Sequence, residues 1–168
     1  ILGGQANNLY RTASGEDIAS KLAEIIDEVT QDENITVHLN TTLEGVEGFV
    51  GNFESSLMSG DEETVIKHGV AVMATGGQPD GPTEYSYGTS GRIVTSLGMD
   101  KKLKANDPVL ETVKSAVFIQ CVGSREPERP YCSRVCCTHS IDNALEIKRR
   151  NPEANVYILY RDIRTYGE

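Results

Sequence analysis

Four cysteines are the residues of this chain best suited to chemistry, and they lie within seventeen positions of one another. Ten residues separate Cys121 from Cys132, three separate Cys132 from Cys136, and Cys137 follows at once. Four thiolates are the ligands of a cubane iron–sulfur cluster or of a structural zinc ion. The spacing matches neither the paired knuckles typical of zinc nor the ferredoxin pattern, and the sequence therefore favours a [4Fe-4S] cluster bound by all four.

Two other uses of these thiols stay open from the residues alone. A cysteine pair, Cys136 with Cys137 or Cys132 with Cys136, could cycle between dithiol and disulfide, and a zinc ion could staple the domain. A secreted disulfide framework is disfavoured, because a disulfide between adjacent cysteines is strained and the chain has regular core-forming segments. We therefore expect a reducing, cytoplasmic setting.

A strand and a helix are predicted to position the thiols. Residues 116–121 are apolar and rich in β-forming types, and residues 133–150 have the periodicity of a helix that Ser133 is expected to cap. Another strand is predicted over residues 155–160. Strand, helix and strand form a Rossmann-like βαβ unit with parallel strands.

This unit places the cysteines where α/β sheets bind ligands. Cys121 is expected at the carboxyl end of a strand, the edge at which open sheets hold their ligands. Cys136 and Cys137 would occupy the first helical turn, whose free N–H groups and dipole stabilise thiolates. Neighbouring helical side chains point about 100° apart, and both can therefore bind only a group at the helix tip. A pyrophosphate-binding turn would read G-x-G-x-x-G, but only Gly123 is present here.

The first half of the chain predicts a further α/β region. Residues 16–30 have the periodicity of an amphipathic helix, with Ser14 as its expected cap. Glycine-punctuated apolar residues then predict a small antiparallel meander and a buried strand that runs into Thr75, Gly76 and Gly77. Small residues at a strand end let the backbone approach a ligand closely. The predicted strands cover residues 34–39, 42–47, 51–58, 64–68 and 70–74.

The middle of the chain is predicted to be a linker. Pro, Gly, Ser and Tyr concentrate in residues 78–91, residues 92–107 have only weak periodicity, and residues 109–112 suit a helical turn. The predicted division is a first domain over residues 1–78, a linker over 79–113 and a second domain over 114–168.

Composition excludes several classes of partner. The net charge of −9 disfavours nucleic acid and anionic membrane surfaces, because both require clustered Lys and Arg. No apolar run approaches the roughly 18–20 residues of a membrane span, and direct membrane insertion is therefore not expected. No residue is a credible acid–base catalyst, and we predict no catalytic side chain.

Several stretches resemble the A subunit of heterodisulfide reductase and its relatives, among them the A and B subunits of the quinone-interacting membrane-bound oxidoreductase of sulfate reducers. The matching stretches are LGGQANNLY (2–10), VEGFVGNF (46–53), GVAVMATGG (69–77), PTEYSYG (82–88), IQCVGSREPERPYCSRVCC (119–137) and VYILYRDIRTYG (156–167). The cysteine segment is highly specific to that family.

The resemblance implies an α/β, thioredoxin-reductase-like flavoprotein with two dinucleotide-binding domains, in which a partial FAD domain with a β-meander precedes a second, Rossmann-like domain. It implies that the cysteine motif binds a [4Fe-4S] cluster close to the flavin. Gly3 and Gly4 resemble the stretch after the acidic residue that holds the adenosine ribose of FAD. Thr75, Gly76 and Gly77 resemble the end of the flavin-domain strand that approaches FAD.

The implied function is electron transfer in an FAD- and [4Fe-4S]-dependent oxidoreductase of anaerobic metabolism. The implied partners are the other subunits of a heterodisulfide reductase-like or quinone-linked complex. In the family, the dinucleotide fingerprint would precede Ile1 and the last flavin-domain segment would follow Glu168. We therefore expect an internal segment that is inactive alone and does not retain FAD, and a bound flavin spectrum would contradict this.

Overall fold

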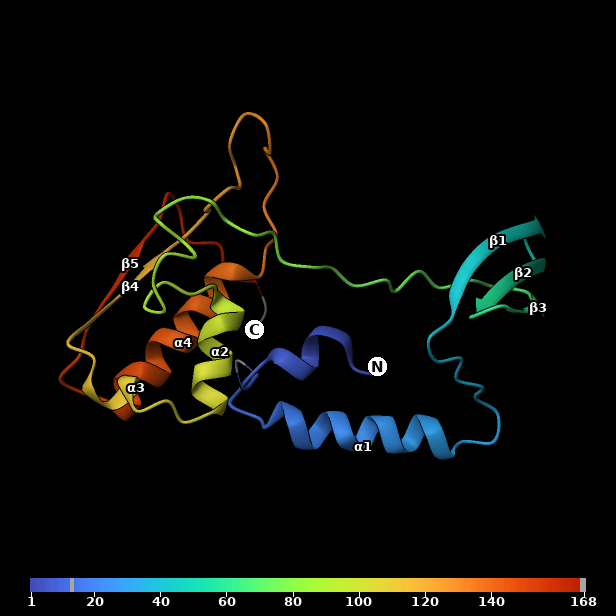
Figure 1. The fold of residues 1–168 in the computed structure, drawn as a ribbon, viewed down its shortest axis with the longest axis horizontal. Helices are drawn as coiled ribbons and strands as arrows, with labels where there is room; N and C mark the ends of the chain where they lie inside the picture. Colours follow the sequence, from blue (N-terminus) through green and yellow to red (C-terminus); the bar gives the residue numbers. More distant parts are fainter. Residues whose placement is uncertain (13, 167–168) are drawn as a thin grey trace. The chain divides into compact units, whose positions relative to one another are not determined.

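The computed structural model describes residues 1–12 and 14–166 (Figure 1), and Gly167, which ends the last matching stretch, lies outside them. A three-stranded antiparallel sheet and a two-stranded parallel sheet, together with helices, make this a mixed α/β chain, as the sequence predicts. The contacts gather the chain into two compact units, which are Ile1–Gln5 with Leu22–Gln78 and Ala6–Lys21 with Pro79–Glu168.

The predicted first helix is confirmed as α1 (Ile18–Gln31), but it begins later than expected. Asp17 provides its start, because the carboxylate accepts hydrogen bonds from the N–H of Ala19 (3.0 Å) and the hydroxyl of Ser20 (2.8 Å). These bonds, that from Ser20 first, lower the pKa of Asp17. The predicted cap at Ser14 is wrong, since that hydroxyl donates to a neighbouring glutamate instead (3.1 Å).

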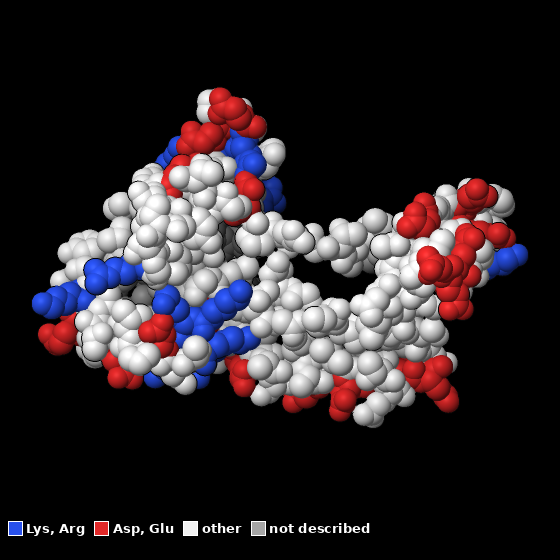
Figure 2. All heavy atoms as spheres, viewed as in Figure 1, with Lys and Arg blue, Asp and Glu red and all other residues white. Residues whose placement is uncertain are grey.

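The predicted meander is confirmed as an antiparallel sheet in the order β1-β2-β3. Its strands are β1 (Thr42–Phe49), β2 (Asn52–Ser59) and β3 (Glu62–His68). The turn between the first two strands requires a glycine: Gly48 has a φ of 96°, and a Cβ there would lie 2.1 Å from the carbonyl oxygen of Asn52. Figure 2 shows carboxylates gathered over this sheet, whose three strands contain a single lysine, Lys67, and no arginine.

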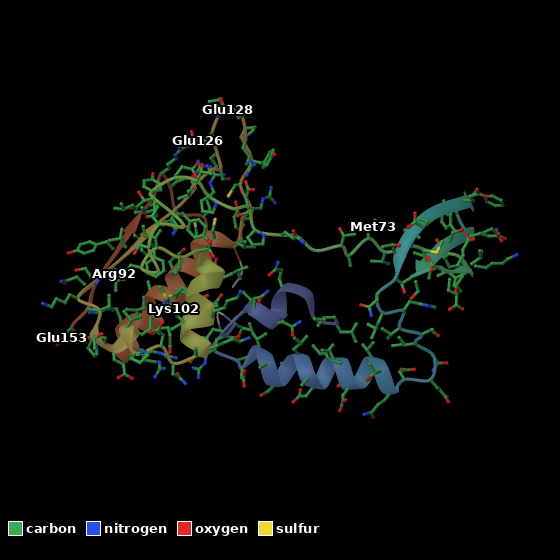
Figure 3. All side chains as sticks on the ribbon, in the orientation of Figure 1. Met73, Arg92, Lys102, Glu126, Glu128 and Glu153 are labelled. Atoms are coloured by element: carbon green, nitrogen blue, oxygen red, sulfur yellow. The ribbon has the colours of Figure 1, made fainter. Side chains whose placement is uncertain are left out.

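Two predicted strands are wrong. Residues 34–39 and 70–74 belong to no sheet in the described chain, and Val70, Val72 and Met73 are exposed (Figure 3 labels Met73). A strand forms only beside another segment that satisfies its backbone hydrogen bonds. Neither stretch pairs with another segment among the described residues. An apolar pattern therefore indicates that a segment is able to pair, not that it does.

The predicted βαβ unit is confirmed. It consists of β4 (Ser115–Ile119), α4 (Cys136–Arg150) and β5 (Asn155–Leu159). The strands pair in parallel, and α4 packs against both. Residues 78–91 contain neither helix nor strand, as predicted. None of the helices in the described ranges combines the length and apolar character needed to cross a membrane.

The hydrophobic core of this unit lies where the helices meet the parallel sheet. The weakly periodic stretch forms α2 (Ser96–Lys104), which Thr95 caps by accepting a hydrogen bond from the N–H of Gly98 (3.1 Å). The predicted helical turn is α3 (Val109–Thr112). Both helices pack against α4. The buried core residues are Leu103, Leu110, Ile147 and Ala154, with Ala116, Phe118 and Val156 of the strands packed against them.

Candidate metal centre

The four thiols are distributed over three short segments at one end of the βαβ unit. Cys121 lies two residues beyond the end of β4, and Cys136 and Cys137 are the first two residues of α4. Cys132 lies in the loop between them. All four are free, Cys137 is buried, and the other three are half-buried. The carboxyl end of a strand and the amino end of the following helix therefore carry three of the four thiols, as the sequence predicts.

The thiols share this end of the unit but do not form a closed cage. No group of three or more His, Cys, Asp or Glu side chains within residues 1–12 and 14–166 is close enough to hold a metal ion. The four sulfurs could bind one group only if the loop between Cys121 and Cys136 moved closer to the other thiols.

The loop is a folded hairpin. Ser124 N–H donates to the carbonyl of Cys121 (3.2 Å), and its hydroxyl donates to the carbonyl of Tyr131 (2.8 Å). Further out, the backbone groups of Glu126 and Arg129 bond reciprocally, at 3.2 and 3.0 Å. These bonds join the two halves of the loop. The bond between Ser124 and Tyr131 holds the residue before Cys132 close to the segment that follows Cys121. Figure 3 shows Glu126 and Glu128 at the far end of the loop.

Hydrogen-bond donors face three of the four sulfurs. The Sγ of Cys121 lies 3.8 Å from Nη1 of Arg125, and the Sγ of Cys132 accepts from the N–H of Arg134 (3.4 Å). The Sγ of Cys136 lies 3.3 Å from a serine hydroxyl. Donors of this kind stabilise sulfur that carries negative charge, as a metal-bound thiolate does. The donor set therefore fits a thiolate-ligated group.

The predicted cap at Ser133 is wrong. The helix begins three residues later, at Cys136, and its cap residue, Val135, has no side-chain cap bond. The Ser133 hydroxyl is the group that lies 3.3 Å from Cys136 Sγ. The first N–H groups of α4 thus have no capping side chain, which leaves the positive end of the helix dipole available to the thiols.

An ion-pair chain links the loop to the segment after β5. Asp162 accepts from Arg164 Nε (2.7 Å) and also pairs with Nη1 of Arg125. These bonds, the one from Arg164 first, lower the pKa of Asp162. The bond to Asp162, followed by the contact with the Cys121 sulfur, raises the pKa of the Arg125 guanidinium. The guanidinium of Arg125, beside Cys121, is therefore held by a carboxylate that lies outside the loop.

His139, in the first turns of α4, has a partner that the sequence does not signal. Its Nε2 lies 2.5 Å from Oδ2 of Asp100, a carboxylate that is 2% exposed. Both side chains line a cavity of about 200 Å³, as does the buried Asn143, whose Nδ2 has no hydrogen-bond partner among the described residues. Asp100 and His139 stand 39 residues apart, and no local pattern in the sequence marks the pair.

The glycines predicted to contact a flavin lie on two segments that meet. Gln5, which follows Gly3 and Gly4, donates from Nε2 to the carbonyl of Gly77 (3.1 Å) across 72 residues of sequence. Gly3, Gly4 and Gly76 have φ values of 92°, 45° and 66°, which suit glycine. Thr75, Gly76 and Gly77 are exposed, and their backbone is open to a ligand.

Comparison with known proteins connects this geometry to an oxidoreductase subunit. No protein-family model matches the chain. It is 39% identical over 121 residues to the A subunit of the H(2):CoB-CoM heterodisulfide,ferredoxin reductase of Methanothermobacter marburgensis, a match that covers 64% of this chain and 18% of that protein. It is 35% identical, with the same coverage, to the iron-sulfur A subunit of the CoB--CoM heterodisulfide reductase of Methanocaldococcus jannaschii.

A third relative is the A subunit of the Ferredoxin/F(420)H(2)-dependent CoB-CoM heterodisulfide reductase of Methanosarcina acetivorans, which is 36% identical over 121 residues, or 64% of this chain and 15% of that protein. The chain thus spans less than a fifth of the length of these curated relatives. Three such relatives match the same share of the chain, which is therefore similar, over nearly two thirds of its length, to the A subunits of heterodisulfide reductases.

Proposed function

We propose that this chain is an electron-transfer segment of an FAD- and [4Fe-4S]-dependent oxidoreductase of the heterodisulfide reductase type. The proposed cluster ligands are Cys121, Cys132, Cys136 and Cys137. The observation that carries the proposal is the placement of four free thiols at one end of a βαβ unit, three of them facing hydrogen-bond donors. Relatives named as iron–sulfur subunits support it.

The protein's own residues would hold and tune this centre. A bound cluster supplies single-electron transfer. The loop hairpin returns Cys132 toward the strand end, the helix dipole of α4 favours negative charge at the adjacent pair of thiols, and Arg125 offsets charge at Cys121. Burial of Cys137 excludes water from one sulfur.

The flavin part of the proposal concerns the other compact unit. We assign Gly3, Gly4, Thr75, Gly76 and Gly77 to contact with FAD, on a thioredoxin-reductase-like fold with two dinucleotide-binding domains. The hydrogen bond from Gln5 to Gly77 supports this, because it joins the two predicted segments. The proposed partners are the other subunits of such a complex, and the proposed location is the cytoplasm.

Metal analysis tests the cysteine assignment. Protein purified without oxygen is expected to contain about four irons and four sulfides per chain. Changing any one of Cys121, Cys132, Cys136 or Cys137 to Ser is expected to abolish or strongly reduce this content. The matched control is Thr138→Ala, which removes a buried hydroxyl that has no partner in the described structure, next to the thiols.

The same measurement separates the alternatives. One zinc per chain, unchanged by anaerobic handling, would instead indicate a structural zinc site. Absence of metal together with two rapidly titrating thiols would indicate a dithiol–disulfide pair, and Cys121→Ser would then spare the reactive pair. Either result would refute the iron–sulfur assignment.

A further inference from the structure

We propose that the cavity between α2, α4 and the segment before α1 binds a small primary amine that has an oxygen acceptor on the adjacent carbon. Asp142 binds the ammonium group, and Asn143 donates a hydrogen bond to the oxygen. The proposed electron-transfer function does not use this cavity, and none of the four thiols lines it. The amine site is therefore independent of whether the thiols bind a metal.

The cavity lies within a single compact unit of the chain. Figure 1 shows α2 beside α4, and the packing of these helices places Asp100 of α2 opposite the first turns of α4. The wall is completed by four residues of the segment before α1, which are Tyr10, Arg11, Thr12 and Gly15. The cavity has a volume of about 200 Å³. Since a single water needs only about 10–15 Å³ of such space, a small organic molecule fits.

Asn143 provides the hydrogen-bond donor of the site. This residue is 3% exposed, and its Nδ2 has no hydrogen-bond partner among the described residues. A buried donor without a partner is costly, and native proteins keep few of them. Because Asn143 lines the cavity, an oxygen atom of a molecule bound there would supply the missing acceptor.

Asp142, the preceding residue of α4, provides the negative charge. It lines the cavity, is half-buried, and forms no hydrogen bond with any described residue. Burial is the largest effect on its pKa and raises it; His139 opposes this effect, and the carboxylate of Asp100 adds to it. A cationic donor in the cavity compensates both causes, because it binds the ionised carboxylate and offsets the repulsion from Asp100.

The other charged groups of the wall have partners within the protein. The contacts are Asp100 with His139 (2.5 Å), Glu146 with Arg149 (2.7 Å), and the guanidinium of Arg11 with the ring of Tyr10 (5.1 Å to its centroid). An anionic ligand is disfavoured, because these arginines are already engaged and Asp142 would repel it. Among the described wall residues, a carboxylate and an amide donor at adjacent positions of one helix are therefore left to recognise a ligand.

These two groups determine the chemistry of the ligand. Adjacent side chains of a helix point about 100° apart, and Asp142 and Asn143 therefore bind different atoms of the same molecule. The carboxylate requires an ammonium group, and the amide requires an oxygen close to it. Amino alcohols and α-amino acids share this chemistry.

Titration of the full, ¹⁵N-labelled chain by nuclear magnetic resonance tests the proposal. The side-chain amide signal of Asn143, identified by its absence from Asn143→Ala, reports the proposed contact itself. Three probes of matched size separate the two groups: ethanolamine, n-propylamine, which lacks the oxygen, and 1,2-ethanediol, which lacks the ammonium. Ethanolamine is expected to shift the signal saturably. The other two should bind at least about tenfold more weakly, because each leaves a buried group of the protein unpaired.

A fourth titration, with glycine, distinguishes the two sources of this chemistry. Tighter binding of glycine than of ethanolamine would assign the site to an amino acid, and weaker binding would assign it to an amino alcohol. Either order supports the shared chemistry, provided that the Asn143 signal shifts saturably.

Variants test the role of the carboxylate. Asp142→Asn keeps the size of the side chain and is expected to weaken ethanolamine binding about tenfold, since it removes the charge that binds the ammonium. The matched control is Glu153→Gln, which removes one negative charge from an exposed position of the same compact unit outside the cavity (Figure 3 labels Glu153). This control should change the affinity less than twofold.

Three outcomes would overturn the proposal. Absence of a saturable shift with all four probes would mean that the cavity holds only water. Equal affinities for ethanolamine and n-propylamine would exclude recognition of the oxygen by Asn143. Equal weakening by Asp142→Asn and Glu153→Gln would indicate attraction by overall charge alone. The probe series needs only the wild-type chain, and it therefore decides even if a variant fails to fold.

Discussion

Glu146 is the residue whose ionisation bears most directly on the stability of the unit that carries the thiols. Hydrogen bonds from Arg149 and then Arg150, against an opposing effect of burial, lower its pKa from 4.5 to about 2. A carboxyl group with a depressed pKa contributes stability above its unfolded value and loses it as the pH falls through its folded value. Glu146 therefore stabilises the fold at neutral pH.

This shift predicts a pH dependence of unfolding. Between pH 4.5 and 2, the free energy of unfolding should fall by at most about 3 kcal/mol on account of Glu146. Urea denaturation at several pH values measures the fall. The variant Glu146→Gln should be less stable at pH 7 and should show a flatter dependence over this range. Parallel curves for variant and wild type would contradict the prediction.

At the scale of single residues, the sequence predicts which side chains could bind a metal, but not which side chains distant in the sequence pair with one another. The four cysteines are predictable as a group because they lie close together in the chain. Arg125 and Asp162 are 37 residues apart, and Asp100 and His139 are 39 apart. Such pairs are made by the packing of whole elements, and no local pattern in a single sequence encodes them.

At the scale of elements, a polar cluster attaches the segment before α1 to α4. Arg150 donates to Glu146 (2.7 Å), to the hydroxyl of Tyr10 (2.9 Å) and to the carbonyl of Leu103 (3.2 Å). Its neighbour Arg149 donates two bonds to Glu146, three residues before it in the same helix, at 2.7 and 2.8 Å. Arg150 therefore connects α4 to α2 and to the segment before α1, whereas the bonds from Arg149 to Glu146 stay within α4.

The two arginines should differ in their effect on stability. Arg149 has the larger influence on the pKa of Glu146, but it is 62% exposed, whereas Arg150 is 13% exposed. Solvent screens the exposed pair, so the more buried pair contributes more to stability. Arg150→Ala should lower the free energy of unfolding by about 2 kcal/mol, and Arg149→Ala by less than about 1 kcal/mol. Equal urea midpoints for the two variants would show that burial does not determine how much each arginine contributes to stability.

Predicted elements are correct wherever their hydrogen bonds are local. Helices and the hairpin-linked strands of the meander satisfy their backbone within a few residues of sequence, and the predictions locate both to within a few positions. Residues 34–39 and 70–74 have strand patterns, but no segment among the described residues pairs with them. The helix starts at Ile18 and Cys136 also differ from prediction, and the serines at the expected caps bind other side chains.

At the scale of the whole molecule, residues 69–81, next to the boundary between the two compact units at residues 78 and 79, are expected to be the most susceptible to proteolysis. Residues 69–81 are exposed throughout and contain neither helix nor strand. A protease needs an accessible, extended segment of this kind. Brief treatment with a broad-specificity protease such as subtilisin should therefore cut first within residues 70–81, as identified by the masses of the products.

The loop between Cys121 and Cys132 provides the internal comparison for this prediction. Pro127 and Glu128 are also exposed, but the reciprocal bonds between Glu126 and Arg129 hold the backbone in a turn. Cleavage there should follow only later. A first cut at residues 126–129 would mean that exposure alone, without extended backbone, determines the site.

The closed turn at Glu126 and Arg129 also bears on how this loop can change during evolution. The two residues at the tip, Pro127 and Glu128, lie beyond the reciprocal bonds, and we expect an insertion between them to move neither Cys121 nor Cys132. We therefore expect related chains to tolerate a gap longer than ten residues between the first two cysteines with the same arrangement of sulfurs. A search for related chains that required this cysteine spacing would miss members with a longer loop tip, whereas a search on the two flanking segments would retain them.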